Sequence, residues 1–180
     1  ERMKQQINGM LLGCKLQSAL FDLQIQPASL SACVRTSVRN NQFFLIRKKT
    51  TLDVSVPKEL TVYTDPSWLV YILDQLLSNA VKYTGEAPVI RIAAGREGEV
   101  VSLSVEDNGT GILPEDLRRV FEKGFTGSNH HNGKYRSTGM GLYMAKKIAD
   151  RMGHELSVES EYGAYTRCCL RFHEHDYFRF

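Results

Sequence analysis

The sequence predicts an α/β fold: a two-layer sandwich of a mixed, mainly antiparallel sheet with helices on one face, preceded by one bundle helix. Two observations predict it. Helical periodicity and strand-like alternation follow one another along the chain instead of occupying separate halves. The 180 residues suffice for one well-cored domain with an appendage, and 42% of them are hydrophobic, as in ordinary globular proteins.

The N-terminal 25 residues predict the bundle helix. They contain no proline, and their apolar residues cover more than one helical face, which is typical of a helix buried in a bundle or dimer. Pro27 ends this helix, and Ser29 is a suitable N-cap for a second helix to about Arg47. The basic cluster Arg47, Lys48 and Lys49 is interpreted as a solvated loop and not as a polyanion site.

The hydrophobic period changes after the second helix. Alternation at 52–56 and a short run at 61–64 predict a hairpin. Asp65 and Pro66 are a favourable helix start, as N-cap and first helical residue, and apolar spacing continues this helix to about Thr84. The remaining predicted elements are strands at 89–93 and 100–106 around a turn at 95–98, a short helix from Pro114, a loop at 124–138, a helix at 141–152, and strands at 156–159 and 165–172.

Composition narrows the classes of function. The net charge of +3 is small and the basic residues are scattered, so we expect no nucleic-acid partner. No apolar run approaches the ~20 residues of a membrane-spanning helix, so we expect no membrane contact by this stretch. The four cysteines form no C-x-x-C pair, which favours reduced thiols, a cytosolic setting and no metal site. The chain starts at Glu1 without an initiator methionine, so we expect the protein to continue upstream. Whether that upstream part contains a membrane anchor stays open.

Two glycine pairs are candidate phosphate contacts: Gly109 and Gly111 after a strand, and Gly139 and Gly141 at a helix start. Their spacing fits neither a dinucleotide fingerprint nor a P-loop. Backbone N–H groups and the dipole at a helix N-terminus nevertheless favour phosphate. Asp107 places one carboxylate beside the first pair, where glycines admit a ligand. Taken alone, either pair favours an ordinary turn.

A polar stripe on the 65–84 helix completes the pattern, because Gln75, Asn79, Lys82 and Tyr83 share one helix face. With the glycine pairs it resembles the N, G1, F and G2 boxes of histidine kinases in order and spacing. The residues that carry the resemblance are Leu76-Leu77-Ser78-Asn79-Ala80-Val81-Lys82-Tyr83-Thr84, Asp107-x-Gly109-x-Gly111, Phe121 with Phe125, and Thr138-Gly139-Met140-Gly141-Leu142. It covers about residues 28–172, and the runs 68–84 and 121–160 are similar to the intramembrane-sensing, bacitracin-sensor subgroup.

The resemblance implies a Bergerat-type ATP-binding fold of the GHKL superfamily, with ATP and Mg²⁺ as cofactors. Asp107 would accept a hydrogen bond from the adenine amino group, and Asn79 would hold Mg²⁺ through its side-chain oxygen. Lys82 would neutralise phosphate charge, Tyr83 would flank the nucleotide, and the 124–138 loop would be a mobile lid. The implied nucleotide contacts are Asn79, Lys82, Tyr83, Asp107, Gly109, Gly111, Phe121, Thr138, Gly139, Met140, Gly141 and Leu142.

The family carries its phosphoacceptor histidine on the first helix of a dimerisation hairpin. The five histidines here, at 130, 131, 154, 173 and 175, all lie elsewhere. The resemblance therefore implies that residues 1–26 are the second hairpin helix and that residues 27–180 are the catalytic domain, with no catalytic residue of its own. The implied partners are an upstream phosphoacceptor helix, a response regulator receiver domain and, in the full-length protein, a second copy in a homodimer. The implied location is the cytoplasmic part of a kinase anchored in the bacterial cell membrane.

Two other functions stay open. GHKL ATPases such as gyrase, Hsp90 and mismatch-repair proteins carry a glutamate base four residues before the Mg²⁺ asparagine. Gln75 stands there instead, and because an amide has no useful basicity, hydrolysis as the main activity is disfavoured. A nucleotide-binding pseudokinase is the second alternative, disfavoured because all four boxes are intact. His130 and His131 are interpreted as solvated loop residues, since no third metal ligand is near them in sequence.

Overall fold

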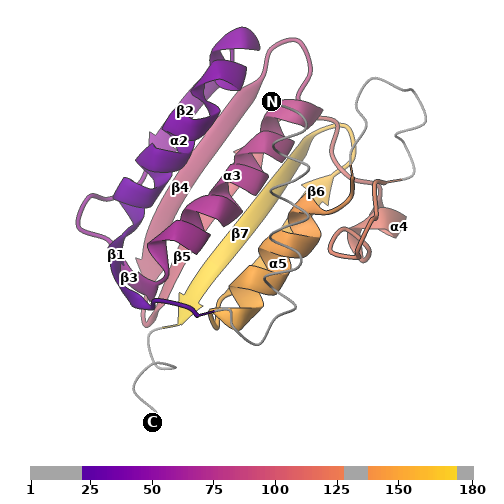
Figure 1. Cartoon of the computed structure of the whole chain (residues 1–180). Coiled ribbons are helices and arrows are strands. Elements are labelled where there is room, and N and C mark those ends of the chain that lie inside the picture. The colour runs from indigo at the N-terminus through magenta and orange to yellow at the C-terminus, as the bar shows by residue number, and fades with distance from the viewer. Residues whose placement is uncertain (1–21, 128–137, 174–180) are drawn as a thin grey trace.

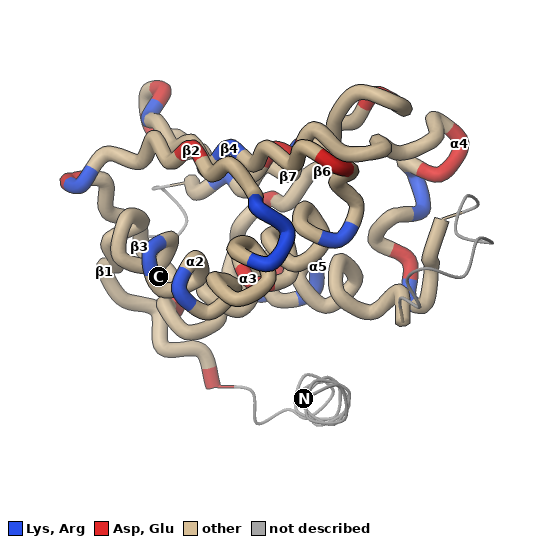
Figure 2. Tube along the Cα trace, turned by 90° about the horizontal axis from the view of Figure 1, so that it is seen from above, with Lys and Arg blue, Asp and Glu red and all other residues tan. Residues whose placement is uncertain are grey.

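The computed structural model describes residues 22–127 and 138–173 and has two layers (Figure 1). One layer is a five-stranded sheet in the order β2-β4-β5-β7-β6, and the described helices α2, α3 and α5 all cover the same face of it (Figure 2). Strand β2 is parallel to β4, and the other pairs are antiparallel. The predicted two-layer sandwich with a mixed sheet is confirmed.

The described elements are β1 (Gln26–Ser29), α2 (Leu30–Arg47), β2 (Thr51–Ser55), β3 (Thr61–Thr64), α3 (Pro66–Tyr83), β4 (Val89–Glu97), β5 (Val100–Asp107), α4 (Pro114–Leu117), α5 (Gly141–Arg151), β6 (Glu155–Glu161) and β7 (Tyr165–His173).

Local capping fixes where the two long helices begin. The Ser29 hydroxyl accepts a hydrogen bond from Ala32 N at 3.3 Å at the start of α2. At the start of α3, the Asp65 carboxylate accepts hydrogen bonds from Ser67 N at 3.0 Å and Trp68 N at 3.3 Å. Each cap satisfies backbone N–H groups that have no partner inside the helix. Both helix starts predicted from the sequence are confirmed.

The core lies between the sheet and the three helices. Along β5 the residues alternate, so that Val101, Leu103 and Val105 are buried while their neighbours are half-buried. They join the apolar faces of α3 and α5 in one cluster of buried side chains. Since Asp107 continues the buried alternation, its carboxylate also lies on the helix-covered side of the sheet.

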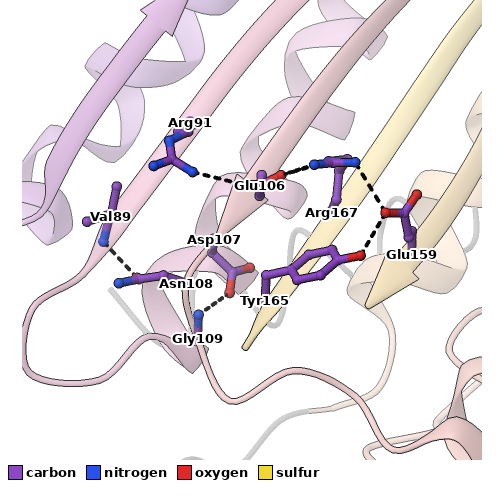
Figure 3. Close-up of polar contacts among 9 residues, drawn as sticks. All are labelled: Val89, Arg91, Glu106, Asp107, Asn108, Gly109, Glu159, Tyr165 and Arg167. Carbon is purple, nitrogen blue, oxygen red and sulfur yellow. Dashed lines mark hydrogen bonds and ion pairs between the residues drawn. The ribbon is translucent and has the colours of Figure 1, made fainter. Parts of the chain in front are cut away.

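The opposite face of the sheet carries a row of alternating charges across four strands (Figure 3). Glu106 on β5 bonds Arg91 on β4 at 3.1 Å and Arg167 on β7 at 2.5 Å. Arg167 also bonds Glu159 on β6 at 3.2 Å. Partly exposed pairs contribute little stability one by one, but opposite charges on facing strands favour this register.

Several predicted boundaries and pairings are wrong. The 52–56 and 61–64 strands form no hairpin, because β2 pairs with β4 and β3 pairs with β1. Alternation shows that a segment is extended but not which strand it joins. The helix predicted for the first 25 residues does not reach residue 25, since 22–25 are irregular and β1 follows. The prediction for residues 1–21 lies outside the described residues. Strand β4 continues through Gly95 to Glu97, so the turn covers only residues 98–99 instead of the predicted 95–98.

The structure also bears on the expectations about membrane-spanning helices and about the cysteines. Among the described helices, none has the length and apolar character that crossing a membrane requires.

Cys168 is buried and Cys169 is half-buried, as expected for strand neighbours on opposite faces. Burial raises the pKa of the Cys168 thiol to about 12, so it stays protonated and unreactive at neutral pH.

Candidate functional site

The turn after β5 is built around a buried carboxylate. Asp107 is 7% exposed, and its Oδ1 accepts a hydrogen bond from Gly109 N at 2.8 Å. A Cβ added to Gly109 would lie 2.6 Å from that Oδ1 and 2.6 Å from Tyr83 O. A Cβ on Gly111, which has a φ of +66°, would collide with Glu161 O. Both positions therefore require glycine, which keeps the backbone close to the carboxylate.

The environment of Asp107 makes it a weakly acidic hydrogen-bond acceptor. Burial raises the pKa of its carboxyl from 3.8 to about 6, the Gly109 N–H group lowers it, and the nearby charge of Glu106 raises it further. At neutral pH the group is still mainly ionised. A buried carboxylate of this kind favours a ligand that donates a hydrogen bond to it.

Asn108 ties this turn to the segment that leads from α3 into β4. Its Oδ1 accepts a hydrogen bond from Val89 N at 2.8 Å (Figure 3). Its Nδ2 donates to Ala87 O at 3.0 Å. The sequence interpretation gave Asn108 no role. An asparagine between Asp107 and Gly109 is a common turn signal, but its two partners are about twenty residues away in the chain and are visible only in the fold.

The C-terminal end of α3 contacts the same turn. Thr110 N donates a hydrogen bond to Tyr83 O at 3.2 Å, which joins the G1 turn (residues 107–111) to the end of the N-box helix. The Lys82 ammonium lies 4.8 Å from the centroid of the Tyr83 ring. Asn79, one turn earlier, is half-buried on the same polar stripe, next to buried Ala80. The structure thus brings the predicted N-box and G1 residues to one place.

The glycines near α5 join the third and fourth predicted boxes. Gly139 has a φ of +64°, and Gly124 N donates to its carbonyl at 3.1 Å. A Cβ on Gly141 would lie 2.8 Å from Gln75 Oε1, so the α3 stripe also reaches the start of α5. Met140 caps α5 without a side-chain hydrogen bond. The first backbone N–H groups of α5 have no acceptor within the helix, so they are donors suited to an anion.

The aromatic residues of the predicted F box occupy different environments. Phe121 is half-buried against the core, whereas the Phe125 ring is stacked under Arg119, whose Cζ lies 4.4 Å from the ring centroid. Thr138 is exposed, and Met140 and Leu142 are half-buried around the start of α5. The lid predicted at 124–138 falls largely outside the described residues, as do His130 and His131.

The fold is a one-sided α/β sandwich, in which a buried carboxylate lies at a strand end with glycines beside it and a helix N-terminus opposite. This combination is typical of ATP-binding domains of the histidine-kinase and gyrase class. A family model described as "Histidine kinase-, DNA gyrase B-, and HSP90-like ATPase" matches residues 64–176. The chain belongs to this family. Its relatives place it, within the family, among the ATP-binding catalytic domains of sensor histidine kinases.

Those relatives include the sensor protein BceS of Bacillus subtilis (strain 168), 40% identical over 151 residues, with 84% of this chain and 44% of that protein covered. The sensor histidine kinase GraS of Staphylococcus haemolyticus is 32% identical over 171 residues, with 95% and 49% covered. The chain spans about half the length of these relatives.

Solved structures share the fold at lower identity. The catalytic domain of histidine kinase ThkA superposes with a TM-score of 0.73 at 21% identity, covering 84% of this chain and 96% of that one. Full-length ShkA in complex with AMPPNP gives a TM-score of 0.79 at 22% identity, covering 95% and 35%. These similarities support the predicted Bergerat-type fold.

Proposed function

We propose that this chain binds Mg²⁺-ATP between the G1 turn, the polar stripe of α3 and the start of α5. The observation that carries the proposal is the buried Asp107 carboxylate, held by Gly109 N at 2.8 Å beside backbone that only glycine can form. The adenine amino group is a neutral donor that such a carboxylate can recognise. Burying a charged ligand group at this depth would cost more desolvation free energy, which more contacts would have to offset.

Each side of the site suits one part of the nucleotide. Asn79 is half-buried and offers an amide oxygen, which fits a Mg²⁺ ion that keeps most of its ligands as water and phosphate. The Lys82 ammonium would turn from the Tyr83 ring toward phosphate oxygens. The first N–H groups of α5, from Gly141 onward, have no acceptor within the helix and would add neutral donors to the phosphates.

We further propose that the whole protein transfers the γ-phosphate to a histidine upstream of this chain, for relay to a response regulator. Relatives named as sensor kinases support this. His154 is a poor acceptor, because burial lowers its pKa to about 4, Thr64 Oγ1 bonds its Nε2 at 2.9 Å, and it lies beyond the far end of α5 from Gly141. His173 pairs with Val100, seven residues along β5 from Asp107 and thus roughly 24 Å away.

The same proposal covers assembly and location. Because residues 22–25 are irregular and β1 begins at Gln26, the predicted division at residue 26 has to move. In the full-length protein, the second helix of a dimerisation hairpin would lie before residue 22, and the catalytic domain would include β1 and all that follows it. The protein would form a homodimer anchored in the bacterial cell membrane, with this part in the cytoplasm. Similarity to BceS and GraS supports the intramembrane-sensing subgroup.

Calorimetric titration with Mg²⁺-ATP tests the binding site. A charge-assisted hydrogen bond is worth about 1.5–3 kcal/mol, so Asp107→Ala should weaken binding at least about tenfold. Asp53→Ala is the matched control, because Asp53 is an exposed carboxylate on β2, the far edge strand. Equal affinity of the parent and Asp107→Ala chains would remove Asp107 from the adenine site.

A labelling experiment tests the direction of transfer. Phosphoryl transfer depends on delivering the nucleophile in line with the γ-phosphate. Incubated with γ-labelled ATP, this chain alone should stay unlabelled. The second sample also contains a longer chain that carries the upstream helix but has the Asp107→Ala substitution. In that sample, this chain should place an acid-labile phosphate on the longer chain. Stoichiometric acid-labile label on this chain alone would contradict the proposal.

A further inference from the structure

The side chain of Lys48, at the end of α2, is bonded to the C-terminal end of α3. Its Nζ donates to Val81 O at 2.5 Å and to Thr84 O at 2.9 Å, and it lies 3.5 Å from Lys82 O. Lys48 is half-buried. The prediction that the basic cluster is a solvated loop is therefore wrong for Lys48, whose partners lie more than thirty residues away.

The position of this ammonium has a clear physical consequence. The last carbonyls of an α-helix have no partner within the helix, and they carry the negative end of its dipole. A lysine that bonds them stabilises the last turn against fraying. The carbonyls that Lys48 contacts belong to Val81, Lys82 and Thr84, and these residues surround Tyr83. Lys48 therefore holds the stretch of backbone that carries Lys82 and Tyr83.

The held segment is continuous with the candidate site. Tyr83 O, in the middle of it, accepts the 3.2 Å hydrogen bond from Thr110 N. Tyr83 O is also one of the atoms that a Cβ on Gly109 would strike, at 2.6 Å. A shift of the 81–84 backbone would therefore displace the G1 turn, and with it the carboxylate of Asp107.

Helix α2 is itself fixed against α3. Asp74 on α3 accepts hydrogen bonds from Ser37 Oγ at 2.5 Å, Asn40 Nδ2 at 3.0 Å and Asn41 Nδ2 at 3.0 Å. Three donors from one helix on one carboxylate set the axial position of α2 on α3. Lys48, at the end of α2, is thus delivered to the end of α3 by a rigid pair of helices.

We propose that Lys48 is a positioning residue for nucleotide recognition, which holds the α3 end in the conformation that presents Lys82, Tyr83 and the G1 turn to ATP. This rests on the proposed ATP site. Lys48 does not touch the nucleotide itself. Lys49 offers a matched control, because it is the adjacent lysine in the same turn and its side chain is exposed.

The test compares Lys48→Met, Lys48→Arg and Lys49→Met with the parent chain by calorimetric titration with Mg²⁺-ATP. The titrations are made at a temperature at which circular dichroism shows that each variant is fully folded. Lys48→Met keeps the aliphatic stem and loses the donors, and its dissociation constant should rise about tenfold. Lys48→Arg, which can still donate to several carbonyls, should stay within about threefold of the parent. Lys49→Met should bind like the parent.

A merely structural cap gives a different result. Lys48→Met would then melt at a lower temperature while the folded protein bound ATP as tightly as Lys49→Met does, and this would overturn the proposal. Amide hydrogen exchange without nucleotide gives a second measurement. Lys48→Met should speed exchange at the Thr110 amide, whose acceptor is Tyr83 O, and unchanged exchange there would also overturn it. A parent chain that fails to bind ATP, with the Thr110 effect present, would refute the proposed function and leave this link standing.

Discussion

Replacing Asp107 by asparagine should make the fold more stable while removing nucleotide binding. The folded-state pKa of Asp107 is about 6, raised from 3.8 mainly by burial. A shift of about two units corresponds to about 3 kcal/mol of folding free energy lost when the group ionises in the folded protein. The asparagine side chain would be neutral and would still offer an oxygen to Gly109 N, so Asp107→Asn should recover up to about 3 kcal/mol at neutral pH.

The pH dependence follows from the sign of this shift. A carboxyl with a raised folded pKa contributes most to stability below its unfolded pKa of 3.8, and the contribution is lost as pH rises through about 6. The stability gained by Asp107→Asn should therefore be largest above pH 7 and should shrink toward zero near pH 4. At 2–4 °C per kcal/mol for a chain of this size, the melting temperature should rise by at most roughly 6–12 °C at pH 7.

Thermal unfolding of the parent and Asp107→Asn chains at pH 4.5, 6 and 7.5 measures both the gain and its pH dependence. The same samples, titrated with Mg²⁺-ATP, should show that the more stable variant has lost affinity, because an amide acceptor lacks the charge. An Asp107→Asn chain that melts at or below the parent's temperature at pH 7.5 would refute the reasoning, since the buried charge would then have no cost.

Three further changes have expected outcomes. Glu106→Gln removes a charge that raises the pKa of Asp107, so the pH midpoint of ATP binding should fall below that of the parent chain, as calorimetry across pH would show. Gly111→Ala should lower the urea-unfolding free energy by about 2 kcal/mol more than Gly98→Ala, because both glycines have positive φ but only Gly111 abuts another backbone. Gln75→Glu should raise ATP hydrolysis in a coupled assay by placing a base beside Gly141, and rapid hydrolysis by the parent chain would contradict the kinase proposal.

The sequence predicted those features that depend on neighbouring residues. Helix starts at Ser29 and Asp65 need only a polar side chain three or fewer residues from the N–H groups it caps. The glycine positions are also local, because a positive φ at Gly111 or Gly139 depends on the absence of a Cβ at that residue. The family boxes then supplied the order in which these local features occur.

Features that depend on distant partners could not be predicted in the same way. Alternation in β2 and β3 shows two extended segments, but their partners are β4 and β1, which lie on other parts of the chain. Lys48 has the sequence context of a surface lysine, and only the packing of α2 on α3 brings it to the carbonyls of Val81 and Thr84. Asn108 likewise has the sequence of a turn residue, and its role depends on the approach of β4.

The most direct test of the central claim is an NMR titration of the labelled chain with Mg²⁺ and a non-hydrolysable ATP analogue. Binding at the proposed site predicts saturable amide shifts at 79–83, at 107–111 and at 139–142, on the helix-covered side of the sheet. The charged row on the other face should change little, so Arg91 and Arg167 serve as internal references. No saturable shifts, or shifts centred on Arg91 and Arg167 instead, would contradict the account.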